Sequence, residues 1–382
     1  MGKVAFRRGG VYPKDKKNLS KNFVLETVTP GSKVFVPLIQ HIGAPSAPVV
    51  EKGDFVSVGQ LIAKATSYVS ANVHSPVSGK VLDFEVRENI VGRKIRHIVI
   101  ENDFQYAKSF MDILENPTRE DIINRVSEAG IVGMGGATFP THVKLDVKKK
   151  IDYLIVNGTE CEPYITIDYR LMLEKTKEIL KGAKYAQKAT GAGKILIGIE
   201  ANKDDAIGLF KELLADDDSI EVFRLKNKYP QGGEKQLIYS LTKRLVPNGG
   251  LPADIGCIVL NVSTCHAIYE AIDLGKPSYT RYLTVTGEGV LRSANLIASV
   301  GIPFSEIIEK TGYFKTTTKL ISGGPMMGIS LHNFKPVVSK GSSALLFLTK
   351  KEAQVASTTP CIGCAKCAQV CPMHLMPMKI DT

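Results

Sequence analysis

The sequence predicts a multidomain α/β protein, and three features of its 382 residues support that prediction. Residues 34–103 consist of short apolar runs separated by glycine and proline turn signals, which is typical of a β-domain. From about residue 118, compact apolar strands alternate with helices, which indicates a parallel sheet covered by helices on both faces. Near the C-terminus, four of the seven cysteines fall within eleven residues, which indicates a metal-ligand set rather than a disulfide scaffold.

The composition is that of a folded protein with an excess of positive charge. Apolar residues make up 44% and charged residues 23% of the chain, and the formal net charge is +11. This charge favours anionic partners but does not indicate which kind. The sequence contains no recognition motif that would indicate nucleic-acid binding. The longest charge-free stretch, residues 34–50, contains three prolines and is too short for a membrane span, and the first residues lack the apolar core of a signal peptide. We therefore expect an intracellular protein without a transmembrane segment of its own.

After an N-terminal arm of residues 1–33, the β-domain of residues 34–103 resembles the barrel-sandwich fold of biotinyl and lipoyl carrier domains. The resemblance rests on the segments Gly53-Asp54-Phe55-Val56-Ser57-Val58-Gly59 and Ser75-Pro76-Val77-Ser78-Gly79-Lys80. Carrier domains are modified on a lysine at a hairpin tip, but the corresponding tip lies near Tyr68 or Val69, where the sequence has no lysine. We therefore expect this domain to be a scaffold.

The central region continues to residue 278. A helix is predicted over residues 118–129, because Thr118 can cap it and Gly130 can end it. Further strands are predicted at residues 153–156, 194–199, 221–225 and 257–260, and further helices at 168–190, 203–215, 234–244 and 265–274. Sheets of this kind bind ligands beyond the carboxyl ends of their strands, so Asn157 and Asn261, each just after a strand, are candidate site residues.

Two further regions precede the cysteines. Residues 279–335 return to β character with a short helix near residues 303–310, which predicts a small mixed α+β module. Residues 336–360 have the composition of a linker that contains one buried apolar run at residues 344–348.

The cysteines have the spacing C-x₂-C-x₂-C-x₃-C-P, which is typical of bacterial [4Fe–4S] sites. The predicted metal ligands are Cys361, Cys364, Cys367 and Cys371. A zinc site or chance clustering is the alternative, but zinc ligands more often come as separated pairs. In this arrangement the fourth cysteine normally serves a second cluster. Either Cys371 completes a single cluster, or the chain is a truncated version of a two-cluster protein, and we favour truncation.

A glycine-rich loop with a nearby lysine is the second candidate site. It contains Gly133, Gly135 and Gly136, followed by Phe139 and Lys144. Glycines allow a ligand to approach backbone N–H donors, and a lysine suits a phosphate or a reduced flavin anion. The loop is not a dinucleotide fingerprint, because Thr138 stands where the last glycine belongs. On the loop alone, a binding site and an ordinary turn are equally good interpretations.

Three more polar loops follow predicted strands or open helices. They contain Asn157, Glu160 and Glu162; Gly232, Gly233 and Glu234; and Asn261 and Thr264. Each loop by itself is weak evidence for a binding site, because ordinary polar loops with helix-capping residues have the same composition. Together they are expected at one edge of the parallel sheet.

These loops occur in the same order as the flavin and NADH loops of the flavoprotein subunit of respiratory complex I. With the segments Gly9-Gly10-Val11-Tyr12-Pro13 and Pro37-Leu38-Ile39-Gln40-His41-Ile42-Gly43-Ala44-Pro45 and the ferredoxin motif, the whole chain resembles the C-subunit family of Rnf electron-transport complexes. That family typically has two ferredoxin motifs. Thr159 and Lys235 depart from the complex I pattern, in which acidic residues are usual at both positions.

The resemblance implies a layout and a set of ligand contacts. It implies a Rossmann-like FMN/NADH domain at residues 104–278, a β-grasp module at 279–335 and a partial ferredoxin-type helical domain at 361–382. It implies FMN contacts from Gly133, Gly135, Gly136, Lys144, Asn157, Gly233, Glu234, Asn261 and Thr264. It also implies NADH contacts from Phe139, Glu160 and Glu162.

The implied function is that of a peripheral subunit of a membrane-bound ion-translocating ferredoxin:NAD oxidoreductase. It would pass electrons between NAD(H), FMN and [4Fe–4S] clusters, of which two are expected in the full-length protein, and only indirectly to or from ferredoxin. It would bind other Rnf subunits at the cytoplasmic face, and no side chain need act as a catalytic acid or base. The alternatives are a soluble flavin/iron–sulfur reductase, such as a cobalamin reductase, and a flavin-free docking scaffold.

Overall fold

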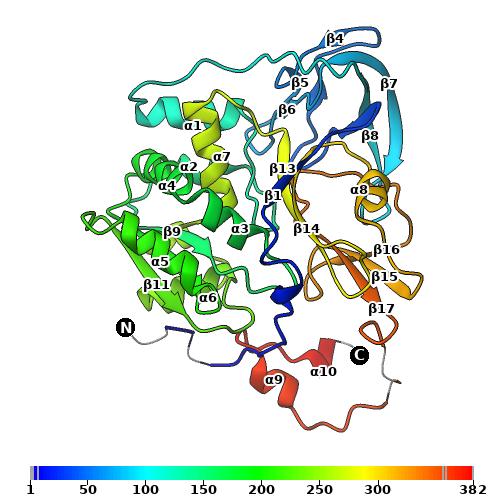
Figure 1. Cartoon of the computed structure of the whole chain (residues 1–382). Coiled ribbons are helices and arrows are strands. Elements are labelled where there is room, and N and C mark those ends of the chain that lie inside the picture. The colour runs from blue at the N-terminus through cyan, green and yellow to red at the C-terminus, as the bar shows by residue number, and fades with distance from the viewer. Residues whose placement is uncertain (1–3, 7, 355–356, 358, 381–382) are drawn as a thin grey trace.

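The computed structural model describes residues 4–6, 8–354, 357 and 359–380. Residues 1–3 and 7 of the predicted arm, 355–356 and 358 of the predicted linker, and 381–382 of the predicted C-terminal domain lie outside the described residues. Within the described residues the chain forms four sheets with helices around them, so a mixed α/β architecture is confirmed (Figure 1).

The N-terminal β-domain consists of two antiparallel sheets, ordered β2-β8-β7-β4 and β3-β5-β6. Val34 and Val36 of β2 are fully buried with Ile98 and Ile100 of β8, because residues two apart on a strand face the same side. The strands are β2 (Lys33–Pro37), β3 (Ala47–Pro48), β4 (Phe55–Val56), β5 (Leu61–Lys64), β6 (Val73–His74), β7 (Gly79–Glu88) and β8 (Lys94–Asn102).

The turn between β5 and β6 contacts the central domain. His142 Nε2 lies 2.9 Å from the Tyr68 carbonyl oxygen, and the Tyr68 hydroxyl donates to Asp146 Oδ2 at 3.1 Å. His142 belongs to α2 (Thr141–Leu145). The predicted hairpin tip therefore contributes to the packing of the β-domain against the central domain.

The central sheet is parallel throughout, with the order β11-β10-β9-β12. Its strands are β9 (Tyr153–Gly158), β10 (Lys194–Glu200), β11 (Ile220–Leu225) and β12 (Cys257–Asn261). Helices cover both faces, with α6 on one face and the remaining central helices on the other. The central helices are α1 (Arg119–Glu128), α3 (Ile167–Glu174), α4 (Thr176–Thr190), α5 (Asp204–Leu213), α6 (Glu234–Thr242) and α7 (Val262–Asp273), with short 3₁₀ turns η1 (Lys17–Leu19) and η2 (Pro252–Ile255).

The single helix predicted over residues 168–190 is wrong in one respect, because it is two helices. Lys175 separates α3 from α4 and has non-helical dihedral angles, φ −133° and ψ 31°. Two hydrogen bonds stabilise the junction between the helices. The Lys175 N–H donates to the Leu171 carbonyl oxygen, and the Thr176 hydroxyl donates to the Met172 carbonyl oxygen. The change of direction lets α4 pack along α7.

A six-stranded mixed sheet has the order β1-β14-β13-β17-β15-β16. Its strands are β1 (Leu25–Val28), β13 (Thr280–Thr286), β14 (Ala294–Ser299), β15 (Thr317–Ser322), β16 (Ile329–Leu331) and β17 (Ala344–Thr349), with helix α8 (Phe304–Thr311) between β14 and β15. β1 comes from the predicted arm, and β17 comes from the predicted linker, so both segments contribute to this sheet. β17 lies between β13 and β15, and its first five side chains are buried, which explains the apolar run in that linker.

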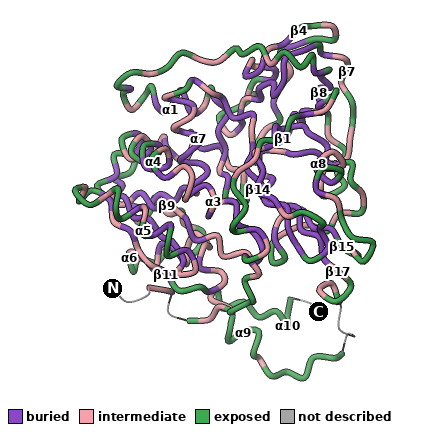
Figure 2. The backbone as a smooth tube through the Cα atoms, in the orientation of Figure 1, coloured by how far each residue is buried: buried purple, intermediate pink, exposed green. Residues whose placement is uncertain are grey.

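The cysteine segment ends the described chain. It contains α9 (Lys366–Val370) and α10 (Pro377–Ile380) and lies beside the N-terminal residues at the bottom of Figure 1. Most of this segment is exposed (Figure 2), in contrast to the buried strands of the two large sheets.

Candidate functional site

The glycine loop meets the N-terminus of α7 at the carboxyl end of β12. The Met134 N–H donates to Thr264 Oγ1 at 3.0 Å. A Cβ atom on Gly135 would lie 3.4 Å from the Asn261 Cβ atom. Asn261 caps α7, since its side chain accepts from the Ser263 N–H at 2.8 Å. The structure thus brings three predicted site residues together: Gly135, Asn261 and Thr264.

The conformation of the loop explains its glycines. Gly136 has φ +119°, a region that L-residues rarely adopt, and no described atom lies within 4 Å of the place where its Cβ would be. The loop is closed by a hydrogen bond of 2.8 Å from the Gly133 N–H to the Phe139 carbonyl oxygen. The backbone therefore leaves open space on one side, as a bound ligand requires.

Lys144 and Glu234 form an ion pair beside this loop. Lys144 Nζ lies 2.9 Å from Glu234 Oε1 and 3.3 Å from the Val259 carbonyl oxygen. Their side chains are 33% and 41% exposed, so a ligand can reach both. Gly233 is the residue before α6, and Glu234 is its first residue, which places both at the positive end of the helix dipole.

Asn157 connects β9 to the loop before α6. Its Nδ2 donates to the Gly232 carbonyl oxygen at 2.9 Å, and its Oδ1 accepts from the Thr159 hydroxyl at 2.7 Å. A Cβ on Gly232 would lie 2.3 Å from Thr159 Oγ1, so only glycine fits there. Thr159, one of the two departures from the complex I pattern, is therefore part of the packing of this loop.

Glu160 and Glu162 are both engaged in hydrogen bonds within the protein. Glu160 is buried and accepts from the Asp168 N–H at 2.7 Å and from Lys17 Nζ at 3.3 Å. Glu162 accepts from the backbone N–H groups of Met326 and Met327, at 3.1 and 2.8 Å. Burial raises the pKa of each carboxyl group above its ordinary value. Lys17 and Lys203 oppose that shift at Glu160, whereas the Met326 and Met327 N–H groups and Lys17 oppose it at Glu162.

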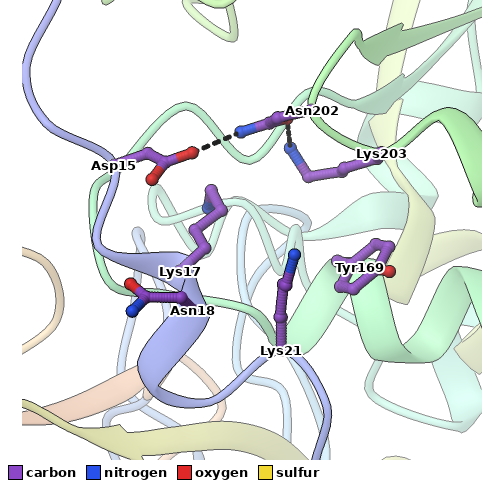
Figure 3. Close-up of a pocket in the computed structure, with 7 residues that line it drawn as sticks. All are labelled: Asp15, Lys17, Asn18, Lys21, Tyr169, Asn202 and Lys203. Atoms are coloured by element: carbon purple, nitrogen blue, oxygen red, sulfur yellow. Dashed lines mark hydrogen bonds between the residues drawn. The ribbon is translucent and has the colours of Figure 1, made fainter.

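Two buried lysines donate hydrogen bonds to the Thr159–Glu162 loop. Lys203 Nζ donates to the Thr159 carbonyl oxygen at 2.6 Å, and Lys17 Nζ donates to the Glu162 carbonyl oxygen at 3.1 Å. Both lysines line a small cavity of about 120 Å³ (Figure 3), which is too small for a flavin. Because both ammonium groups already bind protein oxygens, we interpret this cavity as part of the loop's support.

Two important residues of the site were not predicted from the sequence. Asp168 accepts from Asn261 Nδ2 and from the Ser263 hydroxyl, both at 2.7 Å, and so orients the α7 cap. Arg281, on β13, is 1% exposed and donates to the Met134 and Ser342 carbonyl oxygens, both at 2.7 Å. Burial lowers the pKa of Arg281 to about 10, so the guanidinium stays charged at neutral pH. No local motif marks either residue, because their partners lie far away in the sequence.

The residues at this edge fit a flavin. The open side of Gly136 provides a place where a ligand can approach the backbone. Arg281 Nη1 is buried and has no hydrogen-bond partner among the described residues, while Nη2 of the same guanidinium donates to the Met134 carbonyl oxygen of the loop. Nitrogen donors and a cation suit the carbonyl oxygens and phosphate of FMN.

The four cysteines of the C-terminal motif are free thiols. Cys361, Cys364 and Cys367 are exposed, and Cys371 is partly buried. Across the described ranges, no group of three or more His, Cys, Asp or Glu side chains is arranged to hold a metal ion. The thiol donor set suits an iron–sulfur cluster, but its geometry in this structure is not that of a formed site.

Comparison with known families defines the class of protein. Residues 126–270 match the family described as the Nuo51 FMN-binding domain, and residues 5–105 match the RnfC barrel sandwich hybrid domain. The fold is also similar to a crystal structure of NAD⁺-reducing [NiFe]-hydrogenase in the H₂-reduced state, with a TM-score of 0.52 and 19% identity over 61% of this chain and 47% of that one. The chain is therefore a protein with an FMN-binding domain joined to a barrel-sandwich domain.

Relatives specify the family. The chain is 42% identical to the C subunit of the Na⁺-translocating ferredoxin:NAD⁺ oxidoreductase complex of Acetobacterium woodii, covering 98% of this chain and 86% of the relative. It is 43% identical to the C subunit of the proton-translocating ferredoxin:NAD⁺ oxidoreductase complex of Clostridium ljungdahlii, covering 98% and 83%. It is 40% identical to the C subunit of the ion-translocating oxidoreductase complex of Rhodobacter capsulatus, covering 98% and 74%. The chain belongs to the C-subunit family of Rnf complexes, which confirms the resemblance seen in its sequence.

None of the helices in the described part of the chain can span a membrane. Among the described residues, every helix is either too short or too polar to cross a bilayer.

Proposed function

We propose that this chain is the flavin-binding electron-transfer subunit of an ion-translocating ferredoxin:NAD⁺ oxidoreductase complex. One observation carries the proposal: the glycine loop, the α7 cap and the Lys144–Glu234 pair lie at one sheet edge inside a domain of the FMN-binding family. Two relatives, at 42% and 43% identity, are named for ferredoxin:NAD⁺ oxidoreductase complexes. Neither a soluble cobalamin reductase nor a flavin-free scaffold is favoured by these relatives.

In this proposal the chain's own residues bind and orient the flavin. FMN supplies the conversion between the two-electron chemistry of NAD(H) and the one-electron chemistry of iron–sulfur clusters. The backbone of Gly133, Gly135 and Gly136 approaches the flavin closely, and Lys144 places a positive charge beside it. Asn157, Gly233, Glu234, Asn261 and Thr264 complete the predicted contact set.

The family resemblance implies nicotinamide binding by Phe139, Glu160 and Glu162. Because Glu160 already accepts two hydrogen bonds, we propose that it acts by fixing the loop rather than by contacting the nucleotide. Glu162 is less buried and lies next to the exposed Met326 and Met327, so a nucleotide can reach this side of the loop.

The remaining assignments follow from the family. We propose that the four motif cysteines bind a [4Fe–4S] cluster, and that the chain associates with other subunits at the cytoplasmic side of the membrane. The β-grasp assignment is supported by the strand order β14-β13-β17-β15-β16, in which β17 runs parallel to β13. The domain boundaries predicted from the sequence stay predictions.

Replacing Lys144 tests the flavin site. Lys144→Glu puts a second carboxylate beside Glu234, and we expect FMN affinity to fall about tenfold or more, since a charge-assisted hydrogen bond contributes about 1.5–3 kcal/mol. Flavin fluorescence titration of the refolded apoprotein measures the affinity. Lys148→Glu is the matched control, because Lys148 has the same charge but is 80% exposed and pairs with Asp146. Full flavin affinity in Lys144→Glu would show that the site is assigned wrongly.

A further inference from the structure

Residues 8–12 of the N-terminal arm lie between the cysteine segment and the loop before α6. The Gly10 N–H donates to the Val370 carbonyl oxygen at 2.6 Å. Val11 and Tyr229 exchange two backbone hydrogen bonds, of 2.9 and 2.8 Å. The arm therefore connects α9 directly to the loop that leads to Gly232 and Gly233, as its course at the bottom of Figure 1 illustrates.

Both arm glycines are required by close contacts and by their backbone conformation. Gly9 has φ +68°, and a Cβ there would lie 2.6 Å from the Val370 carbonyl oxygen and 2.9 Å from the Pro372 nitrogen. Gly10 has φ +83°, and a Cβ there would lie 2.5 Å from Lys228 Cε. Contacts this short do not occur in folded proteins, so the arm can touch both neighbours only because it has no side chain here.

A second contact joins the cysteine segment to the flavin side of the molecule. Gln236 Nε2, in the first turn of α6, donates to Met373 Sδ at 2.9 Å. The same helix begins with Glu234, which pairs with Lys144. The cysteine segment therefore lies next to the helix end that forms part of the candidate flavin site.

The burial of the cysteines agrees with these contacts. Cys371, which lies between Val370 and Pro372, is partly buried, whereas the other three motif cysteines are exposed. The contacts of Gly9 and Gly10 with the motif lie at its Val370–Pro372 end, and this end includes the cysteine closest in sequence to the α6 contact at Met373.

We propose that residues 8–12 form a strap that holds the Cys371 end of the cysteine segment against the loop before α6. The strap would fix the separation between the cysteine segment and the flavin site, on which electron transfer between them depends. That consequence rests on the proposed function, but the docking of the segment does not. The strap residues are positioning residues, since none of them belongs to the predicted contact sets.

Gly9→Ala tests the strap, because the added Cβ alone meets Val370 and Pro372. In the reduced, metal-free full chain, we expect the alkylation rate of Cys371 to rise about tenfold towards that of Cys361, because the segment opens locally. Mass spectrometry of the peptides measures both rates, and amide exchange of residues 366–373 should increase with them. An unchanged rate and unchanged exchange would overturn the proposal.

Gly92→Ala is the matched control. Gly92 has φ +76°, so alanine carries a similar backbone strain, but no described atom lies within 4 Å of its Cβ position. We expect Cys371 alkylation to match that of the unaltered chain. FMN titration of the same samples tests the proposed flavin site separately from the strap. A chain that fails to bind FMN would contradict the proposed function, but its Cys371 alkylation rate would still show whether the strap holds the cysteine segment. An equal increase in both variants would show general loosening and overturn the strap.

Discussion

At the scale of single residues, Arg281 connects two parts of the protein that the sequence keeps far apart. Its partner Met134 is 147 positions away and lies inside the glycine loop, while its other partner, Ser342, follows the β16 region. A buried guanidinium is costly to desolvate, and here its hydrogen bonds go to carbonyl oxygens rather than to a carboxylate. The guanidinium is therefore placed to donate a hydrogen bond to the Met134 carbonyl oxygen in the glycine loop.

Replacing Arg281 should loosen the glycine loop. Arg281→Met leaves the Met134 and Ser342 carbonyl oxygens without this donor, and each buried unpaired group costs about 1–3 kcal/mol. We expect faster amide exchange in residues 133–139 and about tenfold weaker FMN binding. Arg292→Met is the control, because Arg292 pairs with Glu26 at the surface. If loop exchange is the same in both variants, Arg281 does not hold the loop.

The residues predicted from the sequence differ from the missed ones in how local their constraints are. Gly136 and Asn261 were predicted from local signals, a glycine-rich loop and a position just after a predicted strand, although the cap that Asn261 forms on α7 was not predicted. Asp168 and Arg281 act on partners 93 and 147 positions away, and no local pattern encodes such a contact. The spacing of the cysteines predicts a metal site, but spacing alone does not fix the positions of four thiols on an exposed segment.

At the scale of elements, the crossing of α4 and α7 depends on one glycine. A Cβ on Gly182 would lie 1.8 Å from the Cys265 carbonyl oxygen, so the two helices approach by backbone contact. The strand–helix alternation predicted these helices from apolar periodicity. It did not predict the break at Lys175 or the strand pairings of β1 and β17, because those depend on packing between distant segments.

Two helical glycines should respond to alanine in opposite directions. Alanine favours a helix over glycine by about 0.8–1 kcal/mol, so Gly208→Ala, which meets open space on α5, should stabilise the protein by up to that amount. Gly182→Ala should instead destabilise it by about 1–3 kcal/mol, because overpacking outweighs propensity. Chemical denaturation measures both. Shifts of the same sign would contradict the close crossing.

At the scale of the whole molecule, Lys340 lies where three regions meet. Its Nζ donates to the Asn72 carbonyl of the β-domain at 2.7 Å and to the Gly130 carbonyl of the central region at 2.5 Å. Its own N–H donates to Gln40 Oε1 at 3.0 Å. Burial lowers the pKa of Lys340 to about 7, and the nearby His41 and His74 have lowered pKa values as well. Docking of the domains is thus linked to the protonation of one buried amine.

This linkage has a definite sign. The unfolded chain binds the Lys340 proton up to about pH 10.5, whereas the folded protein releases it near pH 7, so the unfolded state binds more protons between these values. The Lys340 contribution to stability should therefore rise with pH by about 1 kcal/mol between pH 7.5 and 8.5, and the full cost of burying the charge remains below pH 7. His41 and His74 are largely neutral in this window in both states. Burial raises the pKa values of Cys161, Cys257 and Cys265, so these thiols lose protons more readily in the unfolded chain and produce a smaller slope of the opposite sign. Chemical denaturation at the two pH values measures this difference. Lys340→Met should remove the rise and leave only the small fall due to the buried thiols, whatever its effect on absolute stability, whereas the exposed Lys335→Met should keep the rise. The same slope in Lys340→Met would assign the pH dependence to other groups.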